Sequence, residues 1–171
     1  MKRDIEWVEG AKRLRDALTA NGAFLVAVDA NGKPNPMTIG WGQVGIVWSR
    51  PMFTALVRTS RYTYGCLRSS DSFTVNVPPR GGLKDALTLC GSKSGRDLDK
   101  AAACGLTMVP GKAVETPVID ECALHFECRI VARTQQERED FRSDEVLDRF
   151  YADGDHHLVV FGEIVAAYAS G

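Results

Sequence analysis

The chain has 171 residues, of which 44% are hydrophobic and 25% charged, and its formal net charge is −1. This balance is typical of one globular domain and argues against binding to nucleic acid or to an anionic membrane surface. The N-terminal sequence MKRDIEWVEGAKRLRDAL is too densely charged for a signal peptide, and no apolar stretch is long enough to span a membrane. We therefore expect a cytoplasmic protein whose five cysteines are reduced thiols.

Hydrophobic periodicity predicts one helix followed by a β-rich chain. Apolar residues three or four apart favour a helix over residues 4–20, with Gly22 as its stop. Four β-rich runs then follow: AFLVAVD (23–29), GIVWS (45–49), FTALVR (53–58) and SFTVNV (72–77). Two longer strands are predicted over residues 123–133 and 157–169.

Short helices are predicted over residues 61–70, 82–91 and 96–105, the last ended by Gly105. The mixed-charge segment 135–145 is typical of a solvated loop or helix surface. Strands outnumber helices, and tight turns join them. The sequence therefore predicts a mainly β fold, a β-barrel with peripheral helices, rather than a doubly wound parallel sheet.

Three glycines in TIGWGQVGIVWS (38–49) have the G-x-G-x-x-G spacing of a dinucleotide-binding loop. Such a loop follows a buried strand and opens a helix, whereas here proline-containing segments, KPNPMT and IVWSRP, flank the glycines. The context excludes a Rossmann fingerprint. Gly42 and Gly45 fit a strand bend as well as a ligand contact, and Gly40 is expected to face a ligand.

Cys122, His125 and Cys128 have the spacing of metal ligands. A strand, however, places the two thiols on one face and the imidazole on the other. No metal site is predicted here, and the thiols are expected to be buried as small apolar groups.

Six segments occur in the order found in the flavoredoxin and flavin-reductase-like family. They are NPMTIGW (35–41), VRTSRYT (57–63), FTVNVP (73–78), CGSKSGRDLDK (90–100), CALHFECRIV (122–131) and HLVVFGEIV (157–165). From about Ala23 to the C-terminus the chain resembles this family. The resemblance implies one domain over residues 1–171, with a helix within 1–22 and an FMN-binding split β-barrel over 23–171. It also implies a homodimer with FMN at the subunit interface.

The resemblance leaves the function open among three alternatives. Family members either reduce flavin with NAD(P)H or pass electrons to a protein partner, and a non-catalytic flavin-binding module is the third alternative. We expect an FMN flavoprotein that takes hydride from NADH or NADPH, with a redox protein as the alternative partner. No separate nucleotide motif chooses between the two nicotinamides.

Two hydroxyl-rich basic turns are candidates for the FMN phosphate, because a phosphate needs cations and N–H or O–H donors converging from a turn. The first, residues 58–63, offers Arg58, Thr59, Ser60, Arg61 and Thr63, and the second, residues 92–96, offers Ser92, Lys93, Ser94 and Arg96. Either set alone would more often be a helix cap with solvated charges. Two sets flanking the same barrel favour phosphate binding.

Further flavin contacts follow from the resemblance. The segment matching N-x-M-T-x-x-W lies along the flavin in the family, which implies contacts from Asn35, Thr38, Ile39, Gly40 and Trp41. Asn76 and His125 are further candidates: Asn76 lies in the family-like FTVNVP, and His125 faces outward from the predicted barrel core. A turn-forming role for Asn76 and a core role for Trp41 are the alternatives.

Two adjacent histidines, His156 and His157, precede the last predicted strand. Family members commonly show Gly-Asp-His there, with the histidine near the flavin and the nicotinamide. Counting from Gly-Asp-His selects His156, and counting back from Phe-Gly-Glu selects His157. We favour His157 as the catalytic histidine, since strand register is usually kept better than the turn before it; two solvated turn histidines are the alternative.

Overall fold

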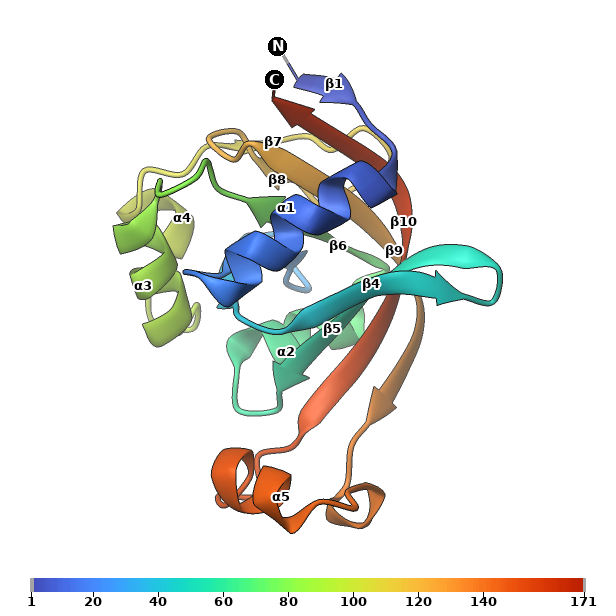
Figure 1. Cartoon of the computed structure of the whole chain (residues 1–171). Coiled ribbons are helices and arrows are strands. Elements are labelled where there is room, and N and C mark those ends of the chain that lie inside the picture. The colour runs from blue at the N-terminus through green and yellow to red at the C-terminus, as the bar shows by residue number, and fades with distance from the viewer. Residues whose placement is uncertain (1, 171) are drawn as a thin grey trace.

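Eight antiparallel strands form one curved sheet within residues 2–170, the part of the chain that the computed structural model describes (Figure 1). They are β1 (Lys2–Asp4), β2 (Ala23–Val28), β3 (Pro34–Ile39), β4 (Gly42–Val47), β5 (Arg50–Arg58), β6 (Ser72–Val77), β9 (Leu124–Gln135) and β10 (His157–Ser170). The order is β3-β2-β6-β9-β10-β5-β4, and β1 pairs with the end of β10. A separate small sheet pairs β7 (Met108–Val109) with β8 (Val118–Ile119).

Five helices lie around this sheet (Figure 1). They are α1 (Trp7–Thr19), α2 (Tyr62–Ser69), α3 (Lys84–Ser92), α4 (Lys100–Ala103) and α5 (Asp144–Phe150). The predicted mainly β fold with helices at its margin is confirmed. Among the described residues the edge strands β3 and β4 do not pair with each other, so the sheet stays open rather than closing into a full barrel.

The core fills the concave side of the sheet with large apolar side chains, among them Phe53, Phe73 and Phe126. A Cβ on Gly162 of β10 would lie 2.5 Å from the Phe73 ring, so glycine is required there for the ring to fit. Helix α1 packs against this core through the buried Leu14. Within residues 2–170 no helix is long and apolar enough to span a membrane.

Two predicted helix boundaries are wrong for tertiary reasons, and one helix was not predicted. The first helix begins at Trp7 and not at residue 4, because residues 2–4 pair with β10. The helix predicted over 96–105 spans only Lys100–Ala103, where the Asp99 carboxylate caps it by accepting from the Ala102 N–H at 3.1 Å. Segment 135–145 leads into α5, which the charge pattern did not predict, since this short helix buries only Leu147.

Candidate functional site

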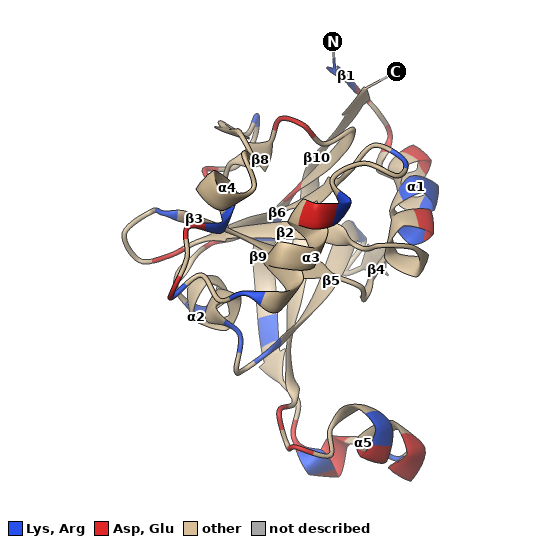
Figure 2. Cartoon of the chain, turned by 90° about the vertical axis from the view of Figure 1, so that its left-hand side faces the viewer, with Lys and Arg blue, Asp and Glu red and all other residues tan. Residues whose placement is uncertain are grey.

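The two predicted basic turns converge on one cavity of about 120 Å³ at the junction of α2, α3 and α4. Its lining residues are Met37, Ser60, Arg61, Tyr62, Thr63, Cys90, Ser92, Lys93, Ser94, Gly95, Arg96 and Lys100. Several of the Lys and Arg positions in Figure 2 lie beside these three helices. We refer to this hollow, with its hydroxyls and cations from both turns, as the anion cavity.

Two hydrogen bonds and one cation–π contact connect the two turns around the anion cavity. The Arg96 guanidinium donates to the Ser60 carbonyl at 3.3 Å and lies 5.4 Å from the centre of the Tyr62 ring. The Arg61 guanidinium reaches the Gly91 carbonyl at 3.5 Å. Each turn therefore contributes a cation whose position depends on the other turn.

Lys100 is a cavity residue that was not among the predicted site residues. It is only 3% exposed, and among the described residues Nζ donates to the Cys90 carbonyl alone, at 3.4 Å. Burial lowers the pKa of Lys100, because a desolvated ammonium is disfavoured. A bound anion would stabilise this charge. The sequence signal that could have identified Lys100 is its place at the end of the family-like segment 90–100.

Part of the first predicted turn binds the chain itself. The Arg58 guanidinium donates to the carbonyls of Asp155, at 2.9 Å, and Phe150, at 2.5 Å. The Thr59 and Ser60 hydroxyls donate to the Asp155 carboxylate at 2.7 and 2.6 Å, and the Ser60 N–H donates at 3.1 Å. A carboxylate thus occupies donors predicted for phosphate, and from that turn only Ser60, Arg61 and Thr63 line the anion cavity.

Strand β3 forms one wall of the site. The Asn35 amide donates to the Thr63 hydroxyl at 2.8 Å, which fixes a cavity residue. A Cβ on Gly95 would collide with Asn35 Oδ1, so only glycine allows the 92–96 turn to approach this amide. Thr38 donates its hydroxyl to the Leu87 carbonyl at 2.6 Å, while Ile39 is a core residue rather than a surface one.

The open edge of β3 explains its prolines. Pro34 and Pro36 lack an N–H, so they fit an edge strand at positions whose backbone faces away from the neighbouring strand β2. Along a strand the N–H and C=O groups of every second residue face the same edge. Those of Thr38, two residues after Pro36, therefore also face the open side. Beyond it Gly40 is exposed, and a Cβ at that position would have no described atom within 4 Å, so nothing in this part of the chain requires glycine there.

Trp41 and His157 belong to an aromatic cluster at the end of β5 and β10. The Trp41 ring is 43% exposed and its centroid lies 5.5 Å from His157 and 5.1 Å from Phe150. His157 is buried, and its Nδ1 lies 2.7 Å from the Tyr151 hydroxyl. Trp41 is therefore a surface ring beside the favoured histidine and not a core residue.

The chemistry of His157 is that of a neutral imidazole. Burial, with the nearby Arg58 cation second, lowers the pKa of His157 to about 4. A neutral ring can accept a hydrogen bond from the Tyr151 hydroxyl at Nδ1 while its own proton sits on Nε2. His156 differs: it stacks on Phe141, with ring centroids 5.5 Å apart.

Residues 15–171 match the family model described as the flavin reductase like domain. The chain belongs to the flavin reductase-like family. It has the FMN-binding fold of that family, and its membership indicates an oxidoreductase in general.

Several relatives share this fold. A flavoredoxin from Methanosarcina acetivorans is 30% identical, with a TM-score of 0.66 over 87% of this chain and 68% of its own. A flavoredoxin from Desulfovibrio vulgaris is 24% identical, with a TM-score of 0.68 over 86% and 68% of the two chains. An uncharacterized Archaeoglobus fulgidus protein is 35% identical over 103 residues, 60% of this chain and 57% of that protein. The chain thus spans less than two thirds of the curated relatives it matches.

Neither His125 nor Asn76 lines the anion cavity. Both are fully buried, and His125 Nδ1 lies 2.8 Å from Asn76 Oδ1 while Nε2 lies 3.1 Å from the Cys122 carbonyl. The outward face of β9 is covered, since the Ile119 N–H also donates to Asn76 Oδ1. Both side chains therefore hold the core together, contrary to the expectation that His125 faces a flavin.

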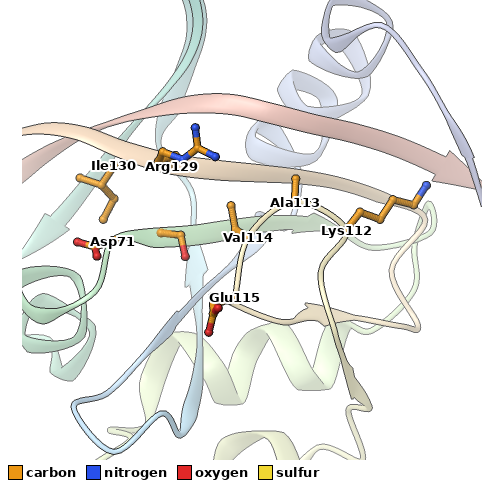
Figure 3. A pocket seen from close by; sticks show the side chains of 8 residues that line it. Asp71, Lys112, Ala113, Val114, Glu115, Arg129 and Ile130 are labelled. Atoms are coloured by element: carbon orange, nitrogen blue, oxygen red, sulfur yellow. The ribbon is translucent and has the colours of Figure 1, made fainter.

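A second hollow, of about 690 Å³, lies between the 112–115 loop and strands β6 and β9 (Figure 3). Figure 3 shows Asp71, Glu115 and Arg129 around it, and none of the predicted site residues lines it. The loop is fastened by the buried Glu127 carboxylate, which accepts from the N–H groups of residues 112–114 at 2.6–3.0 Å. Its charges are mixed in sign, so it is not a candidate for the flavin phosphate.

Proposed function

We propose that this protein is an FMN-dependent flavin reductase that transfers hydride from NADH or NADPH to flavin. The anion cavity carries the proposal, because it surrounds the buried ammonium of Lys100 with hydroxyls and guanidiniums from two separate turns. A buried cation with one weak hydrogen bond is costly unless an anion accompanies it.

The size of the anion cavity fits a phosphate and not a whole flavin. Its volume of about 120 Å³ is well below the 300–1,000 Å³ typical of pockets for drug-sized ligands. The ring must therefore lie outside the cavity, and the exposed Gly40 and Trp41 next to β3 offer an open surface for it. The backbone of Thr38 at the open edge supplies hydrogen-bonding groups for a polar ring edge.

His157 would position the nicotinamide or the flavin ring and donate a hydrogen bond from Nε2, since Tyr151 occupies Nδ1. Bound FMN would supply the hydride acceptor, so the chain needs to supply only binding and orientation. Because the pKa of His157 is lowered to about 4, the histidine carries no positive charge at neutral pH.

A flavoredoxin-type electron carrier that takes electrons from a protein partner is the second candidate function. The 30% identity with the Methanosarcina acetivorans flavoredoxin favours it. Reduction by a nicotinamide separates the two, because an electron carrier of this kind depends on its protein donor. A non-catalytic flavin-binding module would bind FMN and accept electrons from neither source.

The test is an FMN titration followed by quenching of flavin fluorescence, and then mixing with NADH or NADPH while the oxidised flavin absorbance is recorded. We expect binding and rapid bleaching. Lys100→Met should raise the Kd at least about tenfold, the effect of losing one charge-assisted contact. Lys112→Met is the matched control, because Lys112 pairs with Asp4 outside the anion cavity.

Absence of FMN binding would overturn the proposal. Binding without bleaching by either nicotinamide would favour the electron carrier or the non-catalytic module.

We also propose a homodimer, as the family resemblance implies, which would cover exposed apolar side chains such as Ile46 and Trp48.

A further inference from the structure

Two cysteines lie at the junction between α3 and α4, next to the anion cavity. Cys90, in α3, is 1% exposed and lines the cavity, whereas Cys104, directly after α4, is half-buried. Both belong to one apolar cluster, in which Cys104 packs against buried residues that include Cys90. Among the described residues both are free thiols.

Lys100 shows which face of α4 is turned to α3. Its Nζ donates to the Cys90 carbonyl at 3.4 Å, so this face of α4 is turned to α3. Cys104 follows four residues later, and its N–H donates to the Lys100 carbonyl at 3.1 Å. One helical turn places Cys104 on the same face as Lys100, the face that packs toward the cluster containing Cys90.

We propose that Cys90 and Cys104 form a reversible disulfide that weakens anion binding in the cavity. The consequence for flavin rests on the proposed function, whereas the disulfide itself does not. The oxidant is a peroxide, which arises wherever reduced flavins meet oxygen.

The exposure of the two sulfurs sets the order of the steps. Cys104 is the accessible thiol and reacts first: its thiolate sulfur attacks hydrogen peroxide, the O–O bond breaks, and a sulfenic acid and water form. The sulfur of Cys90 then attacks the sulfenic sulfur, an S–S bond forms, and the departing hydroxide takes the Cys90 proton to give water. Two thiols lose two electrons in total, and the peroxide is reduced to two waters. Burial raises the pKa of Cys90 to about 12, so this thiol stays protonated and does not compete with Cys104 for the peroxide.

Disulfide formation would disturb the anion cavity through α4. An S–S bond of about 2.05 Å is much shorter than a non-bonded contact between sulfurs, so the end of α4 must move toward α3. Lys100 shares that short helix with the Cys104 backbone and supplies the buried cation of the cavity. Displacing its ammonium removes the charge-assisted contact with a bound phosphate.

The test uses the full chain, reduced or treated with hydrogen peroxide, in the parent and in Cys104→Ser. Peptide mapping by mass spectrometry identifies the disulfide, and FMN, riboflavin and inorganic phosphate are the ligands. Cys122→Ser is the control, because Cys122 is as buried as Cys90, each 1% exposed, but does not line the anion cavity. Cys90→Ala is a second variant that also removes the pair.

We expect a Cys90–Cys104 cross-link in the parent and in Cys122→Ser, with the FMN Kd raised about tenfold and restored by dithiothreitol. Riboflavin has no phosphate, so its affinity should not change. Cys104→Ser and Cys90→Ala should be insensitive to peroxide. Absence of the cross-link, or a cross-link that leaves FMN binding unchanged, overturns the proposal.

If the reduced parent binds no FMN, the proposed function fails and inorganic phosphate becomes the probe. Stabilisation of the reduced protein by phosphate, measured as the melting temperature, should then disappear on oxidation. Equal stabilisation of both forms, or none in the reduced form, would overturn the switch in that case.

Discussion

Two adjacent histidines, His156 in the turn and His157 at the start of β10, occupy different environments. His157 contacts Trp41 and Tyr151, while His156 packs against Phe141 and Tyr151. Their roles at the proposed flavin site should therefore separate.

We predict that His157→Ala slows flavin reduction by a nicotinamide while FMN affinity falls little. The proposed phosphate contacts lie in the anion cavity, which His157 does not line. His156→Ala should behave almost like the parent. The effect should be modest, since positioning and not proton transfer is lost. Single-turnover reduction rates of the two variants measure it. A slow His156→Ala beside a normal His157→Ala would assign the role to His156. It would contradict the choice of His157, which was made by counting back from Phe-Gly-Glu.

His125 contributes to stability in a pH-dependent way. Burial lowers its pKa to about 4, so on acidification from about pH 6.5 the unfolded chain takes up a proton before the folded chain does. The contribution is therefore complete above about pH 6.5 and lost as the pH falls toward 4, by up to about 3 kcal/mol.

We predict that His125→Gln flattens the loss of unfolding free energy between about pH 7 and 4, although it lowers stability at neutral pH by breaking the Asn76 contact. Urea denaturation across this range measures the slope. His157 titrates in the same direction, so His157→Gln is the comparison, with a similar flattening expected. An unchanged slope in His125→Gln would contradict the buried neutral state.

The segment from η1 (Arg138–Asp140) through α5 to residue 156 projects away from the sheet (Figure 1) and is attached mainly at its base. Arg58 binds its carbonyls, and the Asp155 carboxylate binds the Thr59–Ser60 turn. Burial raises the pKa of Asp155, but the Ser60 and Thr59 hydrogen bonds outweigh this and hold the pKa below its usual value. One carboxylate thus connects this projecting element to a wall of the anion cavity.

We predict that Asp155→Asn loosens the projecting element, because an amide accepts fewer and weaker hydrogen bonds than a carboxylate. Stability should fall by about 1–2 kcal/mol, and backbone amide exchange should rise over residues 136–156. Asp153→Asn is the matched control, since the Asp153 side chain is 70% exposed and its oxygen lies 3.7 Å from Arg58. Equal exchange in both variants would show that the Asp155 contact does not hold this element.

At the scale of the whole molecule, we predict a homodimer in solution. The open sheet leaves the proposed flavin surface beside Trp41 uncovered in one chain, and the β4–β5 hairpin ends in the exposed side chains of Ile46 and Trp48. Sedimentation velocity measures the mass directly. A monomer that retains one FMN per chain would contradict both the dimer and the interface site.

Local pattern was sufficient for much of this architecture. The run SFTVNV became β6 over the predicted residues, and the last strand begins at His157 as predicted. Gly22 ends the first helical segment with a φ of +92°, a conformation that glycine adopts without strain. Side-chain alternation and glycine conformations depend on a few neighbouring residues, and the sequence displays those directly.

Only the tertiary structure decided which partners the polar side chains have. Thr59 and Ser60 form the donor-rich turn that the sequence predicts, yet their anion is Asp155, about 95 residues further along the chain. His125 alternates as expected, but Asn76, the Cys122 carbonyl and the Tyr168 ring enclose it, and Lys100 becomes a buried cation only where α4 meets α3. A turn rich in donors binds whichever anion the fold brings to it, whether a ligand's phosphate or the chain's own carboxylate. Burial and charge pairing depend on segments distant in sequence, so local pattern identifies the donors while the fold selects what they bind.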